Sequence, residues 1–336
     1  MGVLALDPLA KQARASTEAL VQIAFGPVPS RRLGQSLGIN NVPPKHCTYA
    51  CVYCQLGRTP HMHVDRRAFY PVDRIAEAVR QRLQALEKDH ERAPDYATFV
   101  PDGETTLDAN LSEAIPAVKA FGVPTAVITN GSLLDDGEVR DALHQADWVS
   151  IKVDAAHTDV WRAVDRPHGK LSLDAIHDGA RTFASSYSGI LATETMLVRR
   201  VNDHAPEIEA IADWLAALQP TVAYLAIPTR PPAESWVKPP TEEALHAAYQ
   251  ILASRLPRVE WLIGYEGNAF ASTGDTTQDL LQITAVHPMR EDAVRGLLTR
   301  NHQDWSIVER AVTSGAILSL SYGGQRYYVR ALARRG

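Results

Sequence analysis

Three cysteines are the only ones in the 336-residue chain, and they lie within eight residues as Cys47, Cys51 and Cys54. Thiolates are the usual protein ligands of iron-sulfur clusters, and a short loop can direct several of them at one site. The spacing therefore predicts three ligands to one iron-sulfur cluster. Because a four-iron cluster needs four ligands, three cysteines leave one iron open to another molecule.

Two alternatives to a cluster stay open for the cysteines. A disulfide would pair two of them and leave the third, and the charged first 20 residues lack the apolar core of a signal peptide for an oxidising compartment. A zinc site would need a fourth nitrogen or sulfur ligand, from His46, His61 or His63. We interpret His61 and His63, two residues apart, as scaffold after the loop.

The loop from Cys47 to Cys54 has the form Cys-x3-Cys-x2-Cys, with the aromatic Tyr53 before the third cysteine. In this it resembles the loop of radical S-adenosylmethionine (radical SAM) enzymes. The stretch from Phe25 to Gly34 and the sequence Gln55-Leu56-Gly57 are similar to a subgroup described as wyosine-synthesis-like Fe-S oxidoreductases. The resemblance extends from about residue 25 to the C-terminus.

The resemblance implies an enzyme with two cofactors: a 4Fe-4S cluster on the three cysteines and S-adenosylmethionine (SAM) bound at the open iron. An electron donor such as flavodoxin or ferredoxin would reduce the cluster. Reductive cleavage of SAM would give a 5'-deoxyadenosyl radical, which abstracts hydrogen from the substrate. In such enzymes the cofactor carries the chemistry, and the protein positions it.

Short β-branched runs alternate with amphipathic helical patterns along the body of the chain. This alternation predicts an α/β fold with a parallel sheet. Radical SAM proteins resemble a partial TIM barrel, and we expect that architecture, with the active site at the C-terminal ends of the strands. The expected strands are 97–100, 125–129, 148–153, 190–198, 222–227 and 260–263, and the expected helices are 72–90, 108–121, 135–146, 172–186, 205–219 and 241–256.

The sequence Pro101-Asp102-Gly103-Glu104 directly follows the first of these strands. Glycine lets backbone approach a ligand, and carboxylates counter the charge of an ammonium group. The family usually has Gly-Gly-Glu here and holds the SAM amino group with it, so the resemblance implies cofactor contacts for Asp102, Gly103 and Glu104. Asp102 replaces a glycine, which leaves its individual role open, and Asp-Gly is also a common turn.

Further candidates follow the next strands. Asn130 either turns the chain or lines the cofactor site, as the corresponding segment does in the family. Lys152 and Asp154 alternate to one side of a strand, where such a pair indicates either a functional site or a structural ion pair. By resemblance, Glu194 is a ribose or adenosyl contact. Tyr53 either packs near the adenine or shields the cluster.

Arginines at two other places are candidates for ligand contact. The pair Arg31-Arg32 precedes the cysteine loop, and guanidinium groups bind carboxylates and phosphates in a forked geometry. The pair would therefore contact the SAM carboxylate or an anionic substrate, unless it is a solvated surface pair. Thr229 and Arg230 follow a strand and are candidate substrate contacts.

The composition is that of a globular protein, with 45% hydrophobic and 22% charged residues. No apolar run of about 18 residues is present that would span a bilayer. We therefore expect a cytoplasmic protein without a membrane partner. The net charge is −5, yet residues 287–336 contain eight arginines and four acidic residues, so a basic tail follows an acidic body.

The tail predicts a small separate domain. Residues 291–299 and 305–313 have helical patterns, and residues 316–329 predict a hairpin that turns at Gly323-Gly324. Two helices and a hairpin indicate a winged-helix-like domain, whose arginines would meet phosphates, or which would instead dock a protein or act as a lid. The expected division is a helical extension at 1–24, a radical SAM core at 25–273 and a winged-helix-like domain at 274–336.

Two classes of function follow from these patterns. The first is a radical SAM oxidoreductase with an unidentified substrate, for which the subgroup and the basic tail suggest RNA modification. Wyosine-forming enzymes are expected to carry a second cluster on further cysteines, and this chain contains none. The alternative is a nucleic-acid-binding sensor that carries an iron-sulfur cluster. The segment Asp102-Gly103-Glu104 favours the enzyme, since a sensor does not need a SAM pocket.

Overall fold

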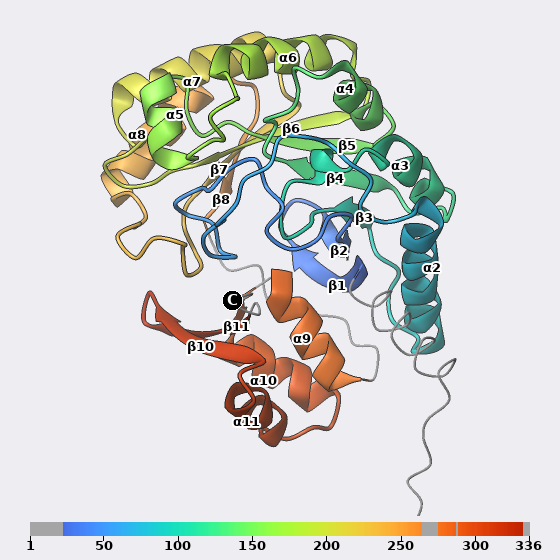
Figure 1. The fold of residues 1–336 in the computed structure, drawn as a ribbon. Helices are drawn as coiled ribbons and strands as arrows, with labels where there is room; N and C mark the ends of the chain where they lie inside the picture. The colour runs from blue at the N-terminus through green and yellow to red at the C-terminus, as the bar shows by residue number, and fades with distance from the viewer. Residues whose placement is uncertain (1–22, 264–274, 287, 332–336) are drawn as a thin grey trace, which may run out of the picture.

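A computed structural model describes residues 23–263, 275–286 and 288–331. Eight strands form one curved sheet in sequence order, and Figure 1 shows it curling into part of a barrel. β1 and β2 are antiparallel, and each later strand is parallel to the one before it. The expected partial TIM barrel is confirmed. The strands are β1 (Ala24–Ser30), β2 (Gly34–Ile39), β3 (Tyr96–Phe99), β4 (Thr125–Thr129), β5 (Trp148–Lys152), β6 (Ile190–Met196), β7 (Val222–Ala226) and β8 (Val259–Leu262).

Helices connect the parallel strands and cover the outer face of the sheet (Figure 1). Their apolar faces form the main core with the sheet; in α7, for example, Ile208, Ile211 and Leu215 are buried, as the helical spacing predicts. The short α5 was not expected from the sequence. The helices are α2 (Val72–Lys88), α3 (Leu111–Lys119), α4 (Gly137–Leu143), α5 (Thr158–Val164), α6 (Leu173–Ser186), α7 (Ala205–Leu218) and α8 (Glu242–Ala253), and a 3-10 turn spans Thr105–Leu107.

A second apolar cluster fills the inside of the half-barrel; its members on β4, β5 and β6 lie in the N-terminal halves of these strands, whereas Ala226 and Leu262 are the last residues of β7 and β8. Leu33 contributes to it from the turn between β1 and β2, a hairpin that the sequence pattern did not reveal. This turn therefore forms part of the floor beneath any ligand at the C-terminal ends of the strands. The other buried members of the cluster are Ala126, Trp148, Ala192, Val222, Tyr224, Ala226 and Leu262.

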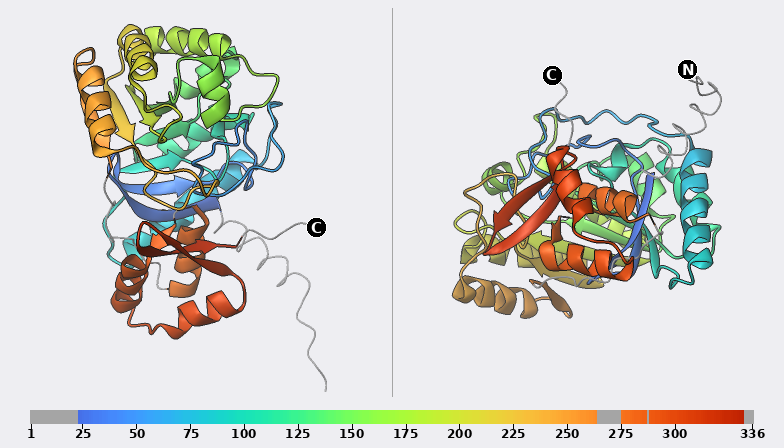
Figure 2. Two further views of the ribbon diagram at one scale, coloured as in Figure 1. Left: turned by 90° about the vertical axis from the view of Figure 1, so that its left-hand side faces the viewer. Right: turned by 90° about the horizontal axis from the view of Figure 1, so that it is seen from below.

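The C-terminal module, residues 276–331, has a core and a sheet of its own. Its helices are α9 (Thr276–Val286), α10 (Glu291–Arg300) and α11 (Ser306–Thr313), and its strands β9 (Met289–Arg290), β10 (Ile317–Tyr322) and β11 (Gln325–Arg330). The sheet order β10-β11-β9, with α9 before β9 and two helices before the hairpin, is the expected winged-helix-like arrangement. Figure 2 shows the module beside β1 and β2.

The module contacts the barrel at two places. On one side Asp279 of α9 pairs with the buried Arg82 of α2, while Val28 of β1 packs into the core of the module. On the other side Tyr322 Oη donates a hydrogen bond to Pro228 O (3.0 Å), and Tyr327 Oη donates one to Thr229 O (2.9 Å). The C-terminal module therefore links the first strand of the sheet with the loop that follows β7.

Two further expectations concern the ends and boundaries of the chain. The helical extension expected at 1–24 lies, up to residue 22, outside the described residues, and so does the expected boundary at 273/274. The division into these domains therefore stays a prediction. None of the described helices combines the length and hydropathy that crossing a bilayer requires.

Candidate functional site

A cavity of about 280 Å³ opens at the C-terminal ends of the parallel strands. Pockets for drug-sized ligands enclose roughly 300–1,000 Å³, so this cavity is close to the lower end of that range. Asp102 and Asp154 are not part of its lining. The predicted site residues that line it are Cys47, Cys51, Tyr53, Cys54, Gly103, Glu104, Asn130, Lys152 and Glu194.

The three cysteines are free thiols on one wall of this cavity. Backbone hydrogen bonds hold the cysteine loop (residues 45–57) against the segment after α5: Val52 N donates to Val164 O (2.9 Å) and Ala50 N to Asp165 O (3.1 Å). The side chain of Val52 is fully buried. The loop is therefore fixed by backbone and apolar contacts that do not involve the thiols.

Burial makes the Cys47 and Cys51 thiols poor thiolates in the absence of a cation. It raises the pKa of Cys47 to about 12, with Glu104 the next contributor. The pKa of Cys51 is also raised well above its ordinary value, first by burial and then by Asp165, whose Oδ1 lies 3.3 Å from its Sγ. Metal ions stabilise deprotonated thiols, so three soft donors around one cavity fit an iron-sulfur cluster.

His46 was the nearest candidate for a fourth zinc ligand. Its Nδ1–H donates to Pro43 O (3.1 Å), and its Nε2 accepts from Arg67 Nη2 (2.9 Å). Its ring also stacks on that of His63, with centroids 5.3 Å apart. Both ring nitrogens of His46 thus have partners in the scaffold around the loop, which favours a cluster over zinc.

Gly103 brings the end of β3 against the cysteine loop. Glu104 N donates to His46 O (2.8 Å), and a Cβ atom at position 103 would lie 2.0 Å from that same oxygen. The Glu104 carboxylate then accepts hydrogen bonds from Thr129 Oγ1 (2.5 Å) and Asn130 N (2.8 Å), and from both the backbone and the hydroxyl of Thr106. Burial nevertheless raises its pKa. Glu104 is therefore a fixed, buried carboxylate beside the thiols.

Asp102 faces away from the cavity. Its side chain is buried, and its Oδ1 has no hydrogen-bond partner among the described residues. Burial raises its pKa from 3.8 to about 7, although Lys45 and Arg330 of the C-terminal module act in the opposite direction. Ionisation of Asp102 therefore lowers the free energy of unfolding.

We expect this effect to be visible as a pH dependence of stability. Between about pH 4 and pH 7 the folded state keeps a proton on Asp102 that the unfolded state has lost, so the free energy of unfolding falls as the pH rises through this window. The fall between pH 4.5 and pH 7.5 should be smaller by about 2–4 kcal/mol in Asp102→Asn, because the amide does not ionise. Urea unfolding at both pH values measures it, and equal falls in the two proteins would contradict the expectation.

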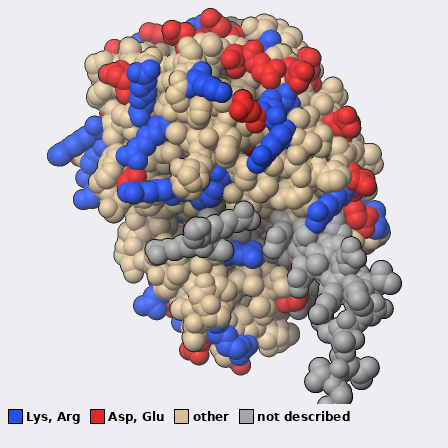
Figure 3. Space-filling model, viewed as in Figure 1, with Lys and Arg blue, Asp and Glu red and all other residues tan. Residues whose placement is uncertain are grey.

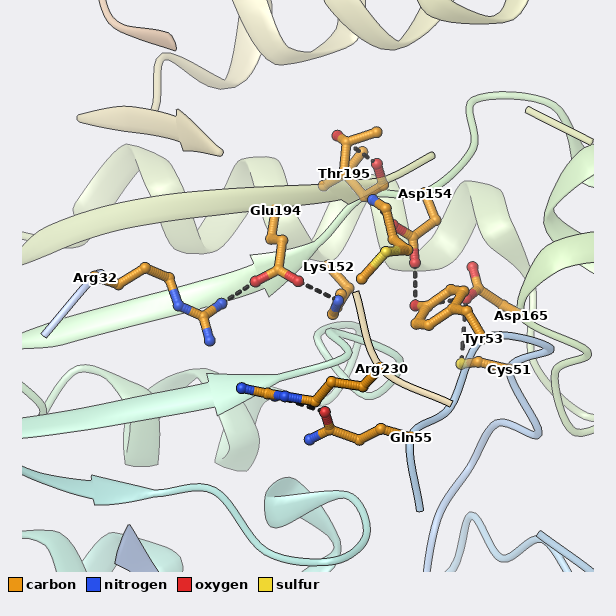
Figure 4. Close-up of polar contacts among 12 residues, drawn as sticks. Arg32, Cys51, Tyr53, Gln55, Lys152, Asp154, Asp165, Glu194, Thr195 and Arg230 are labelled. Carbon is orange, nitrogen blue, oxygen red and sulfur yellow. Dashed lines mark hydrogen bonds and ion pairs between the residues drawn. The ribbon is translucent and has the colours of Figure 1, made fainter. Parts of the chain in front are cut away.

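Glu194 lies between two cations inside the barrel (Figure 4). Lys152 Nζ donates to its Oε1 (2.5 Å), and Arg32, from the turn that forms the floor, pairs with its Oε2. All three residues line the cavity. Burial lowers the pKa of Lys152. The sequence predicted Lys152 with Asp154, but the hydrogen-bonded partner of Lys152 is Glu194.

Asp154 instead fixes Tyr53 of the cysteine loop. The Tyr53 hydroxyl donates to Asp154 Oδ2, as Figure 4 shows, and Met196 N donates to Asp154 Oδ1 (2.6 Å). The Lys152 ammonium lies 5.1 Å from the centre of the Tyr53 ring, within reach of a cation–π interaction. Lys152 on β5 and Asp154 just after it therefore fix the orientation of the Tyr53 ring, which lines the cavity.

Two contributors to the site were not predicted from the sequence: Thr129 holds Glu104, and Asp165 contacts Cys51 (Figure 4). Arg230, which the sequence offered as a candidate substrate contact, lines the cavity, and its Nη1 donates to Gln55 Oε1 (2.6 Å). The position of Thr129 beside Asn130 at a strand end offered a signal. Asp165 offered none, because it lies at the end of a short helix far from any motif.

The fold is a half-barrel, and its candidate site lies at the carboxyl ends of the strands. Three thiols and a fixed carboxylate surround one cavity there. The family model described as "Radical SAM superfamily" matches residues 41–215. A UPF0026 protein of Methanocaldococcus jannaschii is 40% identical over 315 residues, which cover 93% of this chain and 97% of that protein. The chain therefore belongs to the radical SAM superfamily, and to the family of that UPF0026 protein. Membership implies an enzyme of the radical SAM kind, with SAM and an iron-sulfur cluster as cofactors.

Solved structures agree with the fold. A radical SAM methyltransferase from Sphaerobacter thermophilus superposes with a TM-score of 0.52 at 15% identity, covering 68% of this chain and 66% of that one. TYW1 with a bound lysine-pyruvate adduct gives a TM-score of 0.50 at 14% identity, covering 67% and 76%. At such identities the likeness concerns the architecture alone.

Proposed function

We propose that this protein holds a 4Fe-4S cluster on Cys47, Cys51 and Cys54 and reductively cleaves SAM to a 5'-deoxyadenosyl radical that acts on an unidentified substrate. One observation carries the proposal: the three thiols share a cavity with the fixed Glu104 carboxylate and the end of β4. The cofactors supply the electron transfer and the radical. The protein supplies binding and orientation.

Glu104, Gly103 and Asn130 are the residues that we propose for the methionine end of SAM. The Glu104 carboxylate keeps a fixed position through four hydrogen bonds, and an ammonium group there would offset the burial that raises its pKa. Gly103 acts by letting the backbone lie against the cysteine loop. The amide of Asn130 lies 2.8 Å from Thr48 Oγ1 and 3.8 Å from Cys47 Sγ, which places it beside the thiols.

Tyr53, Lys152 and Glu194 are proposed for the adenosyl end. Glu194 can accept hydrogen bonds from ribose hydroxyls while Lys152 and Arg32 balance its charge. We propose that Asp154 and Asp102 act through their neighbours: Asp154 holds Tyr53, and Asp102 lies under the loop that carries Gly103 and Glu104.

RNA modification follows from the subgroup resemblance, and we propose RNA as the first class to test. The alternative function, a nucleic-acid-binding sensor, draws on the winged-helix-like module. A sensor does not require a ligand cavity of about 280 Å³ beside the thiols, and we therefore favour the enzyme.

The test is 5'-deoxyadenosine formation by anaerobically reconstituted and reduced protein given SAM, with Cys47→Ala as the control. We expect product from the parent protein and none from the variant. A parent protein whose spectrum shows the cluster, but which neither binds nor cleaves SAM, would overturn the enzymatic proposal in favour of the sensor.

A further inference from the structure

A basic surface surrounds the outer side of the cysteine loop. Residues 45–70 and 161–170 together contain seven Lys or Arg and two Asp, a local charge of +5 in a chain whose net charge is −5. In Figure 3, Lys and Arg form a band across the face where this loop lies, while most Asp and Glu lie along the upper and right-hand margins. We name it the loop-side patch; its exposed cations are Arg58, Arg67, Arg162, Arg166 and Lys170.

The loop-side patch contains a hollow of about 230 Å³ that is separate from the cavity. No residue lines both. Cationic side chains and one histidine frame the hollow around an apolar base. Its lining residues are Met62, Trp161, Arg162, Arg166, Pro167, His168, Gly169 and Leu171.

Backbone hydrogen bonds join the segment that lines this hollow to the cysteine loop. Ala50, next to Cys51, donates its N–H to Arg166 O (3.2 Å), and His168 N donates to Thr48 O (2.9 Å). Met62 forms a β-bridge with Cys47. The hollow therefore backs directly onto the cysteine loop, on the side opposite its cavity-facing thiols.

The charge of the patch persists after its ion pairs are counted. Glu234 pairs with both Arg58 and Arg166 at 2.8 and 2.6 Å, and Asp65 lies 3.9 Å from Lys170. Asp136 and Glu138 neutralise Arg66, from which they lie 3.4 and 2.9 Å away. Asp165 is buried beneath the surface. Arg58 and Arg166 share the single negative charge of Glu234, so one positive charge remains there, and Arg67 and Arg162 add to it. The patch therefore attracts an acidic surface and speeds its association.

We propose that the loop-side patch is the docking surface for an acidic one-electron donor protein of the flavodoxin or ferredoxin class. This proposal rests on the function proposed above. One electron passes from the donor to the cluster, so that the donor is oxidised and the cluster reduced by one electron, with no bond formed or broken. A polynucleotide substrate fits the position less well, because its reacting nucleotide must enter the cavity, whereas the hollow lies outside it.

The experiment compares Arg162→Glu/Lys170→Glu with the matched control Lys88→Glu/Arg181→Glu, which reverses two charges on the outer helices α2 and α6. Reduction of the reconstituted cluster is followed by stopped-flow absorbance with reduced flavodoxin, and again with photoreduced 5-deazariboflavin, a small neutral reductant. At low salt, we expect flavodoxin to reduce the cluster of the patch variant about tenfold or more slowly than that of the parent. Above about 0.3 M salt, where charges are screened, the difference in rate should be smaller. The control variant and the deazariboflavin rates should match the parent.

Equal flavodoxin rates in all three proteins would overturn the docking surface. So would a patch variant that loses RNA binding in a gel shift while keeping its flavodoxin rate, which would reassign the patch to RNA. Failure of the proposed function gives a different result, namely clusters that deazariboflavin reduces without any 5'-deoxyadenosine from SAM. In that case the flavodoxin rates of the two variants still decide the docking surface.

Discussion

The Cys51→Ala variant should lose its iron-sulfur cluster and all SAM cleavage while its half-barrel stays folded. The thiol is one of three proposed ligands, and the chain contains no other cysteine to replace it. The fold of the loop does not depend on it, because Val52 is buried and the backbone of residues 50 and 52 bonds to residues 164 and 165. Removing a buried thiol that lies beside Asp165 leaves only a small void.

Iron and sulfide content, 5'-deoxyadenosine yield and thermal unfolding of the metal-free protein measure the three parts of this expectation. Thr59→Ala, a substitution of a partly exposed residue shortly after the cysteines, is the matched control and should keep both cluster and activity. An active Cys51→Ala protein without a cluster would contradict the mechanism. A variant that does not fold would show instead that the thiol is structural.

The Arg82→Met variant should lose about 3–5 kcal/mol of free energy of unfolding. Arg82 is buried, its Nε donates to Gly26 O, and its Nη1 lies 3.5 Å from Asp279, whose side chain is fully buried. Burial lowers the pKa of this guanidinium, and Asp279 opposes the shift. Removing one partner of a buried ion pair costs far more than the pair itself contributes, because the other charge stays buried.

Arg80→Met on the same helix is the control, because Arg80 pairs with Glu77 at the surface, where such pairs contribute about 0–1 kcal/mol. Denaturant unfolding measures both variants. The double variant Arg82→Met/Asp279→Leu should recover much of the loss, since it removes the unpaired charge. Equal losses in Arg82→Met and Arg80→Met would show that the pair does not hold the C-terminal module to the barrel.

Most of the regular structure could be predicted from local pattern. Runs of β-branched residues and helical spacing give β3 to β8 and most helices to within a few residues. The hairpin of β1 and β2 was missed because Pro27, Pro29 and several glycines oppose a strand. They are tolerated here because β1 is an edge strand, and because the Phe25 ring covers Gly38, where a Cβ would lie 2.0 Å from Cζ.

The site was predicted as a set of residues but not as a set of partners. Strand alternation put Lys152 and Asp154 on one side, yet β5 ends at Lys152, so the alternation stops there and Asp154 turns to Tyr53. The pairing of Lys152 with Glu194 depends on the register of β5 and β6. The pairing of Arg32 with Glu194 joins residues that are 162 positions apart in the sequence. A local sequence pattern cannot reveal such a pairing.

The link that the C-terminal module makes between β1 and the loop after β7 sets an order of events during synthesis. β1 begins at Ala24, whereas the hairpin that contacts Pro228 and Thr229 ends only at Arg330. A nascent chain on the ribosome therefore completes its parallel sheet well before these contacts can form, since the N-terminal parts of a chain fold first. Until the hairpin has been synthesised, the loop bearing Arg230 lacks the hydrogen bonds that Tyr322 and Tyr327 donate to it, so this restraint on the cavity lining is added only after the barrel is complete.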